Sequence, residues 1–119
     1  MTEPAAPLRL RLRFKRGGAL VLGPGRMDLL EQIDTCGSIS AAARAMGMSY
    51  RRAWLLVDET NGHFARPLVE SVAGGQRGGG ARLTAEGRAV LDLYRAMQRK
   101  AEAAMTAETA ALQALLKTP

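Results

Sequence analysis

The feature that most constrains the fold is a series of short helical segments divided by glycines. An apolar stripe at helical spacing ends at Gly37, in the position of a helix C-cap glycine. The alanine-rich segment 41–46 follows, and Gly47 separates it from a third helix that starts after Ser49. Methyl side chains let helices approach closely, and a short turn with glycine is typical of two crossed helices. Residues 26–62 therefore predict a helix-turn-helix core, with a plain helical bundle as the alternative.

A strand pattern precedes this core. Residues 8–14 alternate strictly between arginine and apolar side chains, Gly17-Gly18 supplies a turn, and residues 19–22 return. The pattern predicts an N-terminal hairpin over residues 8–22. Its exposed face would carry Arg9, Arg11 and Arg13, with Lys15 and Arg16 near the tip. These side chains are expected to form a solvated face that discourages aggregation, and contact with phosphate is the alternative.

A second hairpin and a long helix follow the core. Residues 68–83 suit two strands joined by a glycine-rich loop, and after Thr84 a helix without proline is predicted over 84–117. The predicted fold class is mainly α with small β hairpins, as a winged helix-turn-helix with a long C-terminal dimerisation helix. A chain of 119 residues suits one domain, so residues 1–119 are expected to form a single unit.

The charge balance indicates the class of partner. The chain has 17 lysines and arginines against 11 aspartates and glutamates, a net charge of +6. This excess favours an anionic partner, with nucleic acid first and a membrane surface second. No run of about 18 apolar residues and no signal-peptide pattern occurs, so we expect no membrane segment. The single cysteine, Cys36, fits a reducing compartment, and we expect a cytoplasmic protein.

The start of the third helix carries the first candidate DNA site. In a helix-turn-helix, the N-terminal residues of the second helix of the motif meet base edges in the major groove. The candidates here are Ser49, Tyr50, Arg51 and Arg52. The two arginines point about 100° apart, so one can contact guanine while the other takes a phosphate. Which arginine does which stays open, and a plain solvated basic turn is the alternative.

The glycine-rich loop at 74–80 carries the second candidate site. Its glycines would let the backbone approach a duplex, and the candidate contacts in the wing are Gln76, Arg77 and Arg82. The loop lacks the Lys-Ser or Lys-Thr pair of a nucleotide-binding P-loop. A flexible loop without DNA contact is the alternative.

Trp54 allows two interpretations. It follows Tyr50 by four residues, so its indole could touch the sugar-phosphate backbone. We expect instead that it packs between helices with Ala53 and Val57, because one large aromatic residue commonly anchors a small core.

Residues for catalysis are sparse. His63 is the only histidine and lies after the third helix, while Asp58 and Glu59 are expected to be solvated. A pairing of Cys36 with His63 would be accidental. No cluster of metal-ligand residues occurs in the sequence. We therefore expect no enzyme, no cofactor and no metal site.

The last predicted helix carries an apolar stripe that continues past the compact body. Core packing explains its first half equally well, but the part after Ala101 is expected to pair with a second copy. The candidate dimerisation residues are Tyr94, Met97, Ala101, Ala104, Met105 and Leu112.

A family resemblance rests on two segments. Residues 37–54, GSISAAARAMGMSYRRAW, resemble the helix-turn-helix of the ModE family of molybdate-responsive transcription regulators. Residues 74–84, GGQRGGGARLT, are similar to that family's glycine-rich wing and the helix start that follows it. The resemblance extends from about Leu20 to Ala104, and LysR-type regulators resemble the chain more distantly.

The resemblance implies a homodimeric, sequence-specific transcription regulator on a partly palindromic operator, within molybdenum homeostasis. Ser49, Tyr50, Arg51, Arg52 and the wing would then contact DNA. The family's C-terminal molybdate-binding module does not occur within these residues, so no molybdate site is carried over and the small-molecule effector is unknown. Two alternatives are a protein-interaction adaptor on the same fold and a small oxyanion-binding protein that uses the loop at 74–80.

Overall fold

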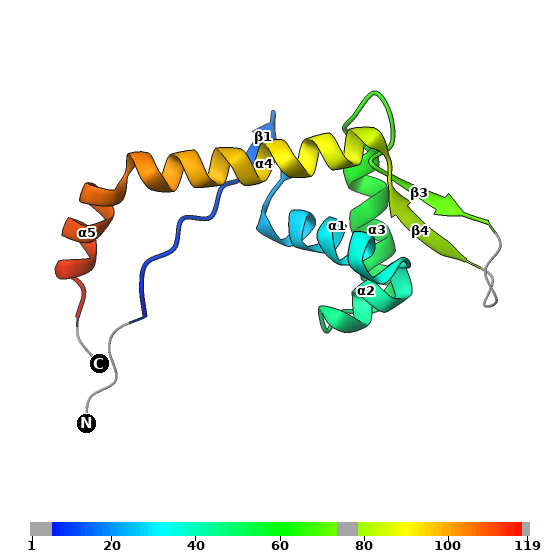
Figure 1. Ribbon diagram of the computed structural model, residues 1–119, viewed down its shortest axis with the longest axis horizontal. Coiled ribbons are helices and arrows are strands. Elements are labelled where there is room, and N and C mark those ends of the chain that lie inside the picture. Colours follow the sequence, from blue (N-terminus) through cyan, green and yellow to red (C-terminus); the bar gives the residue numbers. More distant parts are fainter. Residues whose placement is uncertain (1–5, 74–78, 118–119) are drawn as a thin grey trace.

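The fold places three short helices and a hairpin against one end of a long helix (Figure 1). We describe it from a computed structural model, which covers residues 6–73 and 79–117. The elements are β1 (Phe14–Arg16), β2 (Ala19–Leu22), α1 (Pro24–Cys36), α2 (Ile39–Ala45), α3 (Tyr50–Gly62), β3 (Val69–Val72), β4 (Gly80–Leu83), α4 (Ala85–Ala104) and α5 (Thr106–Ala114). The strands form two separate antiparallel pairs. The predicted class, a mainly helical winged helix-turn-helix with small hairpins, is confirmed.

Local signals in the sequence set the ends of the three core helices. α1 ends at Gly37, whose φ of 78° lies in the left-handed region. Ser38 and Ser49 cap α2 and α3, each accepting a hydrogen bond from the backbone N–H three residues on, at 3.0 and 3.1 Å. Gly47 forms the turn between α2 and α3 with a φ of 66°. The helix-turn-helix core runs from Pro24 to Gly62, so it begins two residues before the predicted range 26–62.

The core lies where α1, α2, α3 and α4 meet the second hairpin. The alanines of α2 allow close packing as expected, because Ala42 and Ala43 are at most 2% exposed. The buried apolar residues are Leu22, Met27, Leu29, Leu30, Ile33, Ala42, Ala43, Ala53, Val57, Leu68, Val69, Ala81, Leu91 and Tyr94. One continuous cluster therefore fixes the orientation of α3 relative to the hairpin β3–β4.

The wing, the hairpin β3–β4, is joined to the helices through backbone hydrogen bonds. The N–H of Ala81 donates to the carbonyl of Gly37, at 2.9 Å, which connects β4 to the end of α1. The Asn61 side chain accepts from the N–H groups of Leu68 and Val69, at 2.8 and 3.2 Å, and donates to the Val69 carbonyl at 3.1 Å. The wing is thus fastened to both α1 and α3.

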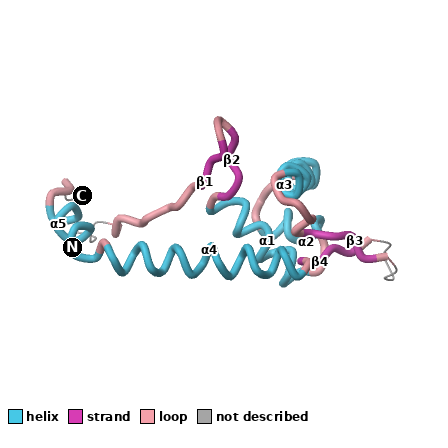
Figure 2. The backbone as a smooth tube through the Cα atoms, turned by 90° about the horizontal axis from the view of Figure 1, so that it is seen from above, coloured by secondary structure: helices cyan, strands magenta, loops and turns pink. Residues whose placement is uncertain are grey.

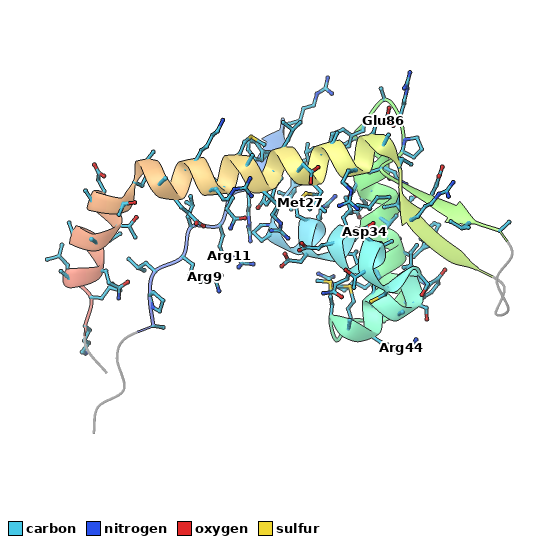
Figure 3. The ribbon with its side chains drawn as sticks, viewed as in Figure 1. Arg9, Arg11, Met27, Asp34, Arg44 and Glu86 are labelled. Carbon is cyan, nitrogen blue, oxygen red and sulfur yellow. The ribbon has the colours of Figure 1, made fainter. Side chains whose placement is uncertain are left out.

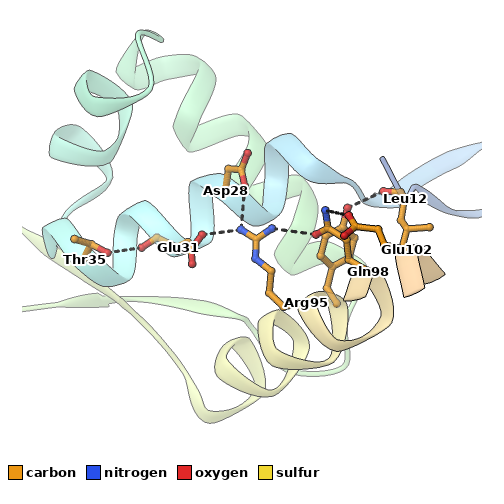
Figure 4. Close-up of polar contacts among 8 residues, drawn as sticks. Leu12, Asp28, Glu31, Thr35, Arg95, Gln98 and Glu102 are labelled. Atoms are coloured by element: carbon orange, nitrogen blue, oxygen red, sulfur yellow. Dashed lines mark hydrogen bonds and ion pairs between the residues drawn. The ribbon is translucent and has the colours of Figure 1, made fainter. Parts of the chain in front are cut away.

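Ion pairs hold α4 along α1. Arg95 donates to Asp28 at 3.0 Å and to Glu31 at 2.6 Å, and Figure 4 shows its guanidinium between the two carboxylates. Arg88 pairs with Asp34 near the other end of α1. Together these contacts follow the whole length of α1, so they set the direction in which α4 leaves the body.

The prediction of one helix over 84–117 is wrong, because α4 ends at Ala104 and α5 starts at Thr106. The hydroxyl of Thr106 donates back to the carbonyls of Glu102 and Ala103, at 3.2 and 3.1 Å, and such back-bonding commonly bends a helix. Figure 1 shows α5 turning away from the α4 axis. The turn brings Gln113 to the N-terminal segment, where it accepts a hydrogen bond from the Leu8 N–H at 2.6 Å.

The predicted hairpin over 8–22 is shorter than expected, because its first strand begins only at Phe14. Phe14 pairs with Leu22, and α1 starts at Pro24, so the returning strand has no residues left to pair with residues 8–13. Residues 6–13 run instead as an irregular segment beside α4 (Figure 2). The hydroxyl of Tyr94 on α4 donates to the Leu12 carbonyl, at 2.8 Å, and holds this segment in place.

Candidate nucleic-acid interface

The start of α3 presents a polar surface to solvent. Ser49 uses its hydroxyl oxygen to accept the cap hydrogen bond from the Arg52 N–H, which leaves its own O–H free to donate. Tyr50 is 56% exposed, and Arg51 and Arg52 are exposed beside it. A helix N-terminus carries positive partial charge, which these two guanidinium groups reinforce. The structure thus brings four predicted site residues together in one turn that suits an anionic partner.

Neither Arg51 nor Arg52 forms an ion pair with a carboxylate in the described part of the chain. Arginines elsewhere in the body do form such pairs, namely Arg26, Arg66, Arg82, Arg88 and Arg95. An ion pair satisfies the hydrogen-bond donors of an arginine before a partner arrives. The charges at the start of α3 therefore remain available to a ligand.

The wing is only partly described. Gln76 and Arg77, the predicted contacts at its tip, lie outside the described residues. Arg82 on β4 is 67% exposed and donates to Glu70 on β3 at 2.8 Å. A phosphate contact by Arg82 would therefore have to share or replace an exposed ion pair across the hairpin.

The expectation that Trp54 packs between helices is wrong. Its side chain is 46% exposed on α3, next to Leu55 at 41%. The small alanines of α2 and the buried Ala53 close the interior without the indole. Trp54 instead borders a cleft of about 110 Å³ between α3 and the wing, with Asn61 and Glu70 also lining it. The indole thus lies on the surface that joins the two predicted DNA-contacting elements.

Two polar residues that position α3 were not singled out in the sequence. Asn61 fastens α3 to β3 through its side-chain amide. Arg26 on α1 is 10% exposed, donates to Thr60 at 3.2 Å and pairs with Glu59 at 2.9 Å. Asn61 and Arg26 hold the C-terminal half of α3. In the sequence, Asn61 and Arg26 were each visible only as a polar residue at a helix position close to the core.

The pKa shifts mark the contacts that orient α4. Hydrogen bonding to Asp34 raises the pKa of Arg88. Burial disfavours the charge of Arg95, but its hydrogen bonds to Asp28 and Glu31 outweigh that effect and raise its pKa. A backbone hydrogen bond in the first turn of α4, and then the pairing with Arg66, lower the pKa of Glu86. The three shifts favour the charged forms of Arg88, Arg95 and Glu86.

The predicted dimerisation residues divide into buried and exposed groups. Tyr94 is 1% exposed and belongs to the core, so its assignment to a dimer contact is corrected. Met97 is 37% exposed, Ala104 is exposed, and Leu112 is 55% exposed on α5. Leu93, which the prediction omitted, is 63% exposed four residues before Met97. The four-residue spacing between Leu93 and Met97 places both on one face of α4, and the prediction did not use this spacing.

The two remaining candidates, Ala101 and Met105, are half-buried near the end of α4. Met105 lines an apolar groove of about 450 Å³ between α5 and the N-terminal segment, together with Leu8 and Leu10.

Residues 6–73 and 79–117 contain no group of three or more histidine, cysteine, aspartate or glutamate side chains that could hold a metal ion. None of the helices in these ranges has the length and apolar character needed to cross a membrane.

The sequence of this region matches one family of known proteins. Residues 25–88 match the profile of the bacterial regulatory helix-turn-helix proteins of the lysR family. The matched region runs from α1 into the first turn of α4, so it contains the helix-turn-helix and the wing. The chain belongs to the lysR family of bacterial regulatory helix-turn-helix proteins.

Individual relatives are similar over most of this chain. It is 45% identical over 85 residues to the molybdenum-pterin-binding protein MopA of Rhodobacter capsulatus, which is 71% of this chain and 32% of MopA. It is 42% identical over 105 residues to the molybdenum transport protein ModE of Azotobacter vinelandii, which is 88% of this chain and 38% of that protein. The DNA-binding transcriptional dual regulator ModE of Escherichia coli K12 is 41% identical over 87 residues, which is 73% of this chain and 32% of that regulator. The chain therefore spans about a third of the length of these curated relatives, and the resemblance to ModE regulators is confirmed.

Proposed function

We propose that this chain binds double-stranded DNA and regulates transcription, with the start of α3 in the major groove. The observation that carries the proposal is the exposed, capped first turn of α3, where Arg51 and Arg52 lack a carboxylate partner among the described residues. The family supports the same function, because its members are regulatory helix-turn-helix proteins. The role is binding rather than catalysis, and the 119 residues act as one DNA-binding unit.

Each site residue has a defined part in this proposal. One of Arg51 and Arg52 donates two hydrogen bonds to a guanine, while the other contacts phosphate. Ser49 donates its free hydroxyl hydrogen to phosphate, and Tyr50 packs on a thymine methyl or donates to phosphate. Gln76, Arg77 and Arg82 serve the wing, which follows the backbone next to the groove that α3 enters.

The regulator acts as a homodimer on a partly palindromic operator. The exposed apolar side chains of α4 and α5 support this, since Leu93, Met97 and Leu112 have no partner within the described chain that covers them. Burying such groups against a second copy removes them from water, which stabilises a dimer by about 25 cal/mol for each Å² of apolar area. A two-fold dimer sets two α3 helices about 34 Å apart, or a multiple of that distance.

The biological setting follows from the relatives. Their names refer to molybdenum transport, molybdenum-pterin binding and DNA-binding transcriptional regulation. We therefore place the function of this chain in molybdenum homeostasis, in the cytoplasm where promoter DNA lies.

The test is a salt titration of binding to duplex DNA. The wild-type chain is expected to bind a mixed-sequence duplex with an affinity that falls steeply with salt. Selection from a random-sequence pool then yields a preferred site. Replacing the base-contacting arginine, by Arg51→Ala or Arg52→Ala, is expected to cost about 1–3 kcal/mol and to relax the preference at one base position.

The control is Arg99→Ala, which removes an exposed arginine on α4. It should leave the preferred site unchanged. If both Arg51→Ala and Arg52→Ala bind all sequences as the wild type does, α3 is not the recognition helix. If the wild type binds no duplex at low salt, the proposed function is wrong and a protein-interaction adaptor becomes the better interpretation.

A further inference from the structure

A strongly basic segment lies outside the helix-turn-helix and the wing. We call residues 8–16 the basic arm, because five of these nine residues are basic: Arg9, Arg11, Arg13, Lys15 and Arg16. All five side chains are exposed. The arm therefore presents five exposed positive charges within nine residues.

The basic arm is held by hydrogen bonds to its backbone and by half-buried leucines, and none of the hydrogen bonds within the described residues uses its arginine side chains. The Tyr94 hydroxyl binds the Leu12 carbonyl at 2.8 Å, and Gln113 accepts from the Leu8 N–H at 2.6 Å. Leu10 and Leu12 are half-buried. Because neutral contacts fasten one side of the arm, the charged side stays free for a partner.

No described carboxylate forms an ion pair with the basic arm. The ion pairs within the described residues join other arginines to carboxylates of the body, the wing and α4. Several separated positive charges attract a polyanion more strongly than they attract a small anion, because each charge can meet a separate anionic group. Double-stranded DNA supplies such groups at regular intervals along its backbone.

The part of the basic arm that precedes β1 lies on the side of the molecule that carries the recognition elements. Figures 1 and 2 both place residues 6–13 on the side of α4 where α1, α2 and α3 lie. Figure 3 shows Arg9 and Arg11 below α4, as it does Arg44 of α2, whereas Glu86 lies above. The longest extent of the molecule is 53 Å, which corresponds to about fifteen base pairs at roughly 3.4 Å each. One duplex can therefore meet both α3 and the arm.

We propose that the basic arm binds DNA phosphates beside the base pairs that α3 contacts. This inference rests on the proposed function, since it requires that the chain bind duplex DNA. The arm contributes affinity without sequence preference, because phosphates carry no base identity. It is a third DNA-contacting element in addition to α3 and the wing.

The test compares Arg11→Gln/Arg13→Gln with the wild type on a mixed-sequence duplex over a range of salt concentrations. Each lost phosphate contact lowers the slope of log affinity against log salt by about 0.9, so a reduction of about two is expected. At about 50 mM salt we expect the affinity to fall tenfold or more. The base preference obtained by site selection should not change.

Two matched variants separate arm contacts from net charge. Arg66→Gln/Arg99→Gln removes the same charge from two exposed positions outside the arm. Arg66 pairs with Glu86, which lies above α4 in Figure 3, and Arg99 lies on α4 five residues after Tyr94. Arg11→Lys/Arg13→Lys keeps the charge on the arm. We expect both variants to bind nearly as the wild type does. Circular dichroism should show every variant folded, because these side chains are exposed.

Placing the arm variant in the Arg51→Ala/Arg52→Ala background tests whether the contacts are separate. The slope should fall by the same amount again, because contacts that share no partner act additively. The proposal is overturned if the arm variant keeps the wild-type slope, or if the charge-matched control lowers the slope equally. Those results would leave DNA binding by α3 intact, whereas failure of the wild type to bind DNA would reject the proposed function as well.

Discussion

Gly87 determines how closely α4 approaches the wing. It is buried in the first turns of α4, and a Cβ built on it would lie 2.0 Å from the Leu68 carbonyl oxygen and 2.9 Å from the Leu68 carbonyl carbon. Glycine inside a helix costs about 0.5–1 kcal/mol relative to alanine. The close contact explains why glycine occupies this position, because any side chain here would collide with the backbone of Leu68.

Gly87→Ala is therefore expected to destabilise the fold by about 3 kcal/mol, the upper end of typical overpacking effects, because two backbone segments must separate. Thermal or urea unfolding measures the change. Gly25→Ala is the matched control, because Gly25 also lies in a helix but has nothing within 4 Å of an added Cβ. That control should be neutral or slightly stabilising, and equal losses in both variants would contradict the close approach.

At the scale of elements, α4 is the support on which the other parts are arranged. Its first turn meets the wing, its middle pairs with α1, and Tyr94 fixes the N-terminal segment. The ring of Tyr94 also packs edge-on against Phe14 of β1, with centroids 6.3 Å apart. Tyr94 is thus the point where the first hairpin, the core and α4 come together.

Burial raises the pKa of Tyr94 above the usual value of tyrosine. A folded-state pKa above the unfolded value means that the contribution to stability is complete below the unfolded pKa and is lost as pH rises through the folded pKa. We expect Tyr94→Phe to be about 0.5–1.5 kcal/mol less stable at neutral pH, through loss of the hydrogen bond to Leu12. This difference should shrink in alkaline solution above about pH 10, where ionisation of Tyr94 destabilises only the wild type.

Chemical unfolding at several pH values, with phenolate absorbance as a second readout, measures both effects. Tyr50 is exposed in both proteins and provides the internal reference. A constant stability difference across the alkaline range would show that Tyr94 is not protected from ionisation.

At the scale of the whole molecule, α4 carries apolar side chains beyond the core. Leu93 is 63% exposed and Met97 37%, although both lie on a helix whose other face is packed. The longest extent of 53 Å arises because α4 and α5 continue past the body, as Figure 2 shows. A second copy that packs on this face would cover the exposed residues, as the proposed dimer requires.

Leu93→Glu is expected to convert a dimer into a folded monomer, because a charge would have to be buried at the contact. Sedimentation equilibrium at tens of micromolar measures the mass, and a DNA titration should show weaker binding. Ala85→Glu adds the same charge at the exposed first residue of α4, so it should remain dimeric. A monomeric wild type would reject the dimer, and a dimeric Leu93→Glu would place the contact elsewhere.

The parts of the fold that depend on local signals could be predicted from the sequence. The caps at Ser49 and Thr84 and the left-handed glycines Gly37 and Gly47 each act within a few residues of the chain. The exposed basic turn at the start of α3 follows directly from them.

Features that depend on distant contacts, or on a choice between local structures that the segment allows equally, could not be predicted. The exposure of Trp54 follows from alanines on another helix that already close the core. The end of α4 depends on the back-bonding of Thr106, which helix propensity does not include. The short β1 reflects how few residues separate the hairpin from α1. In each case the composition of the segment was compatible with more than one structure.

The hydrogen bond from Ala81 to the carbonyl of Gly37 has a consequence for the thermodynamics of recognition. It joins the described base of the wing to the turn that precedes α2, so the helices and the wing strands are already oriented relative to one another in the free protein. The conformational entropy of aligning these elements is lost during folding and does not oppose association. In the proposed complex, DNA would meet a preorganised body, so α3 and the wing strands would need no further alignment on binding, while side chains such as Arg51 and Arg52 would still become ordered.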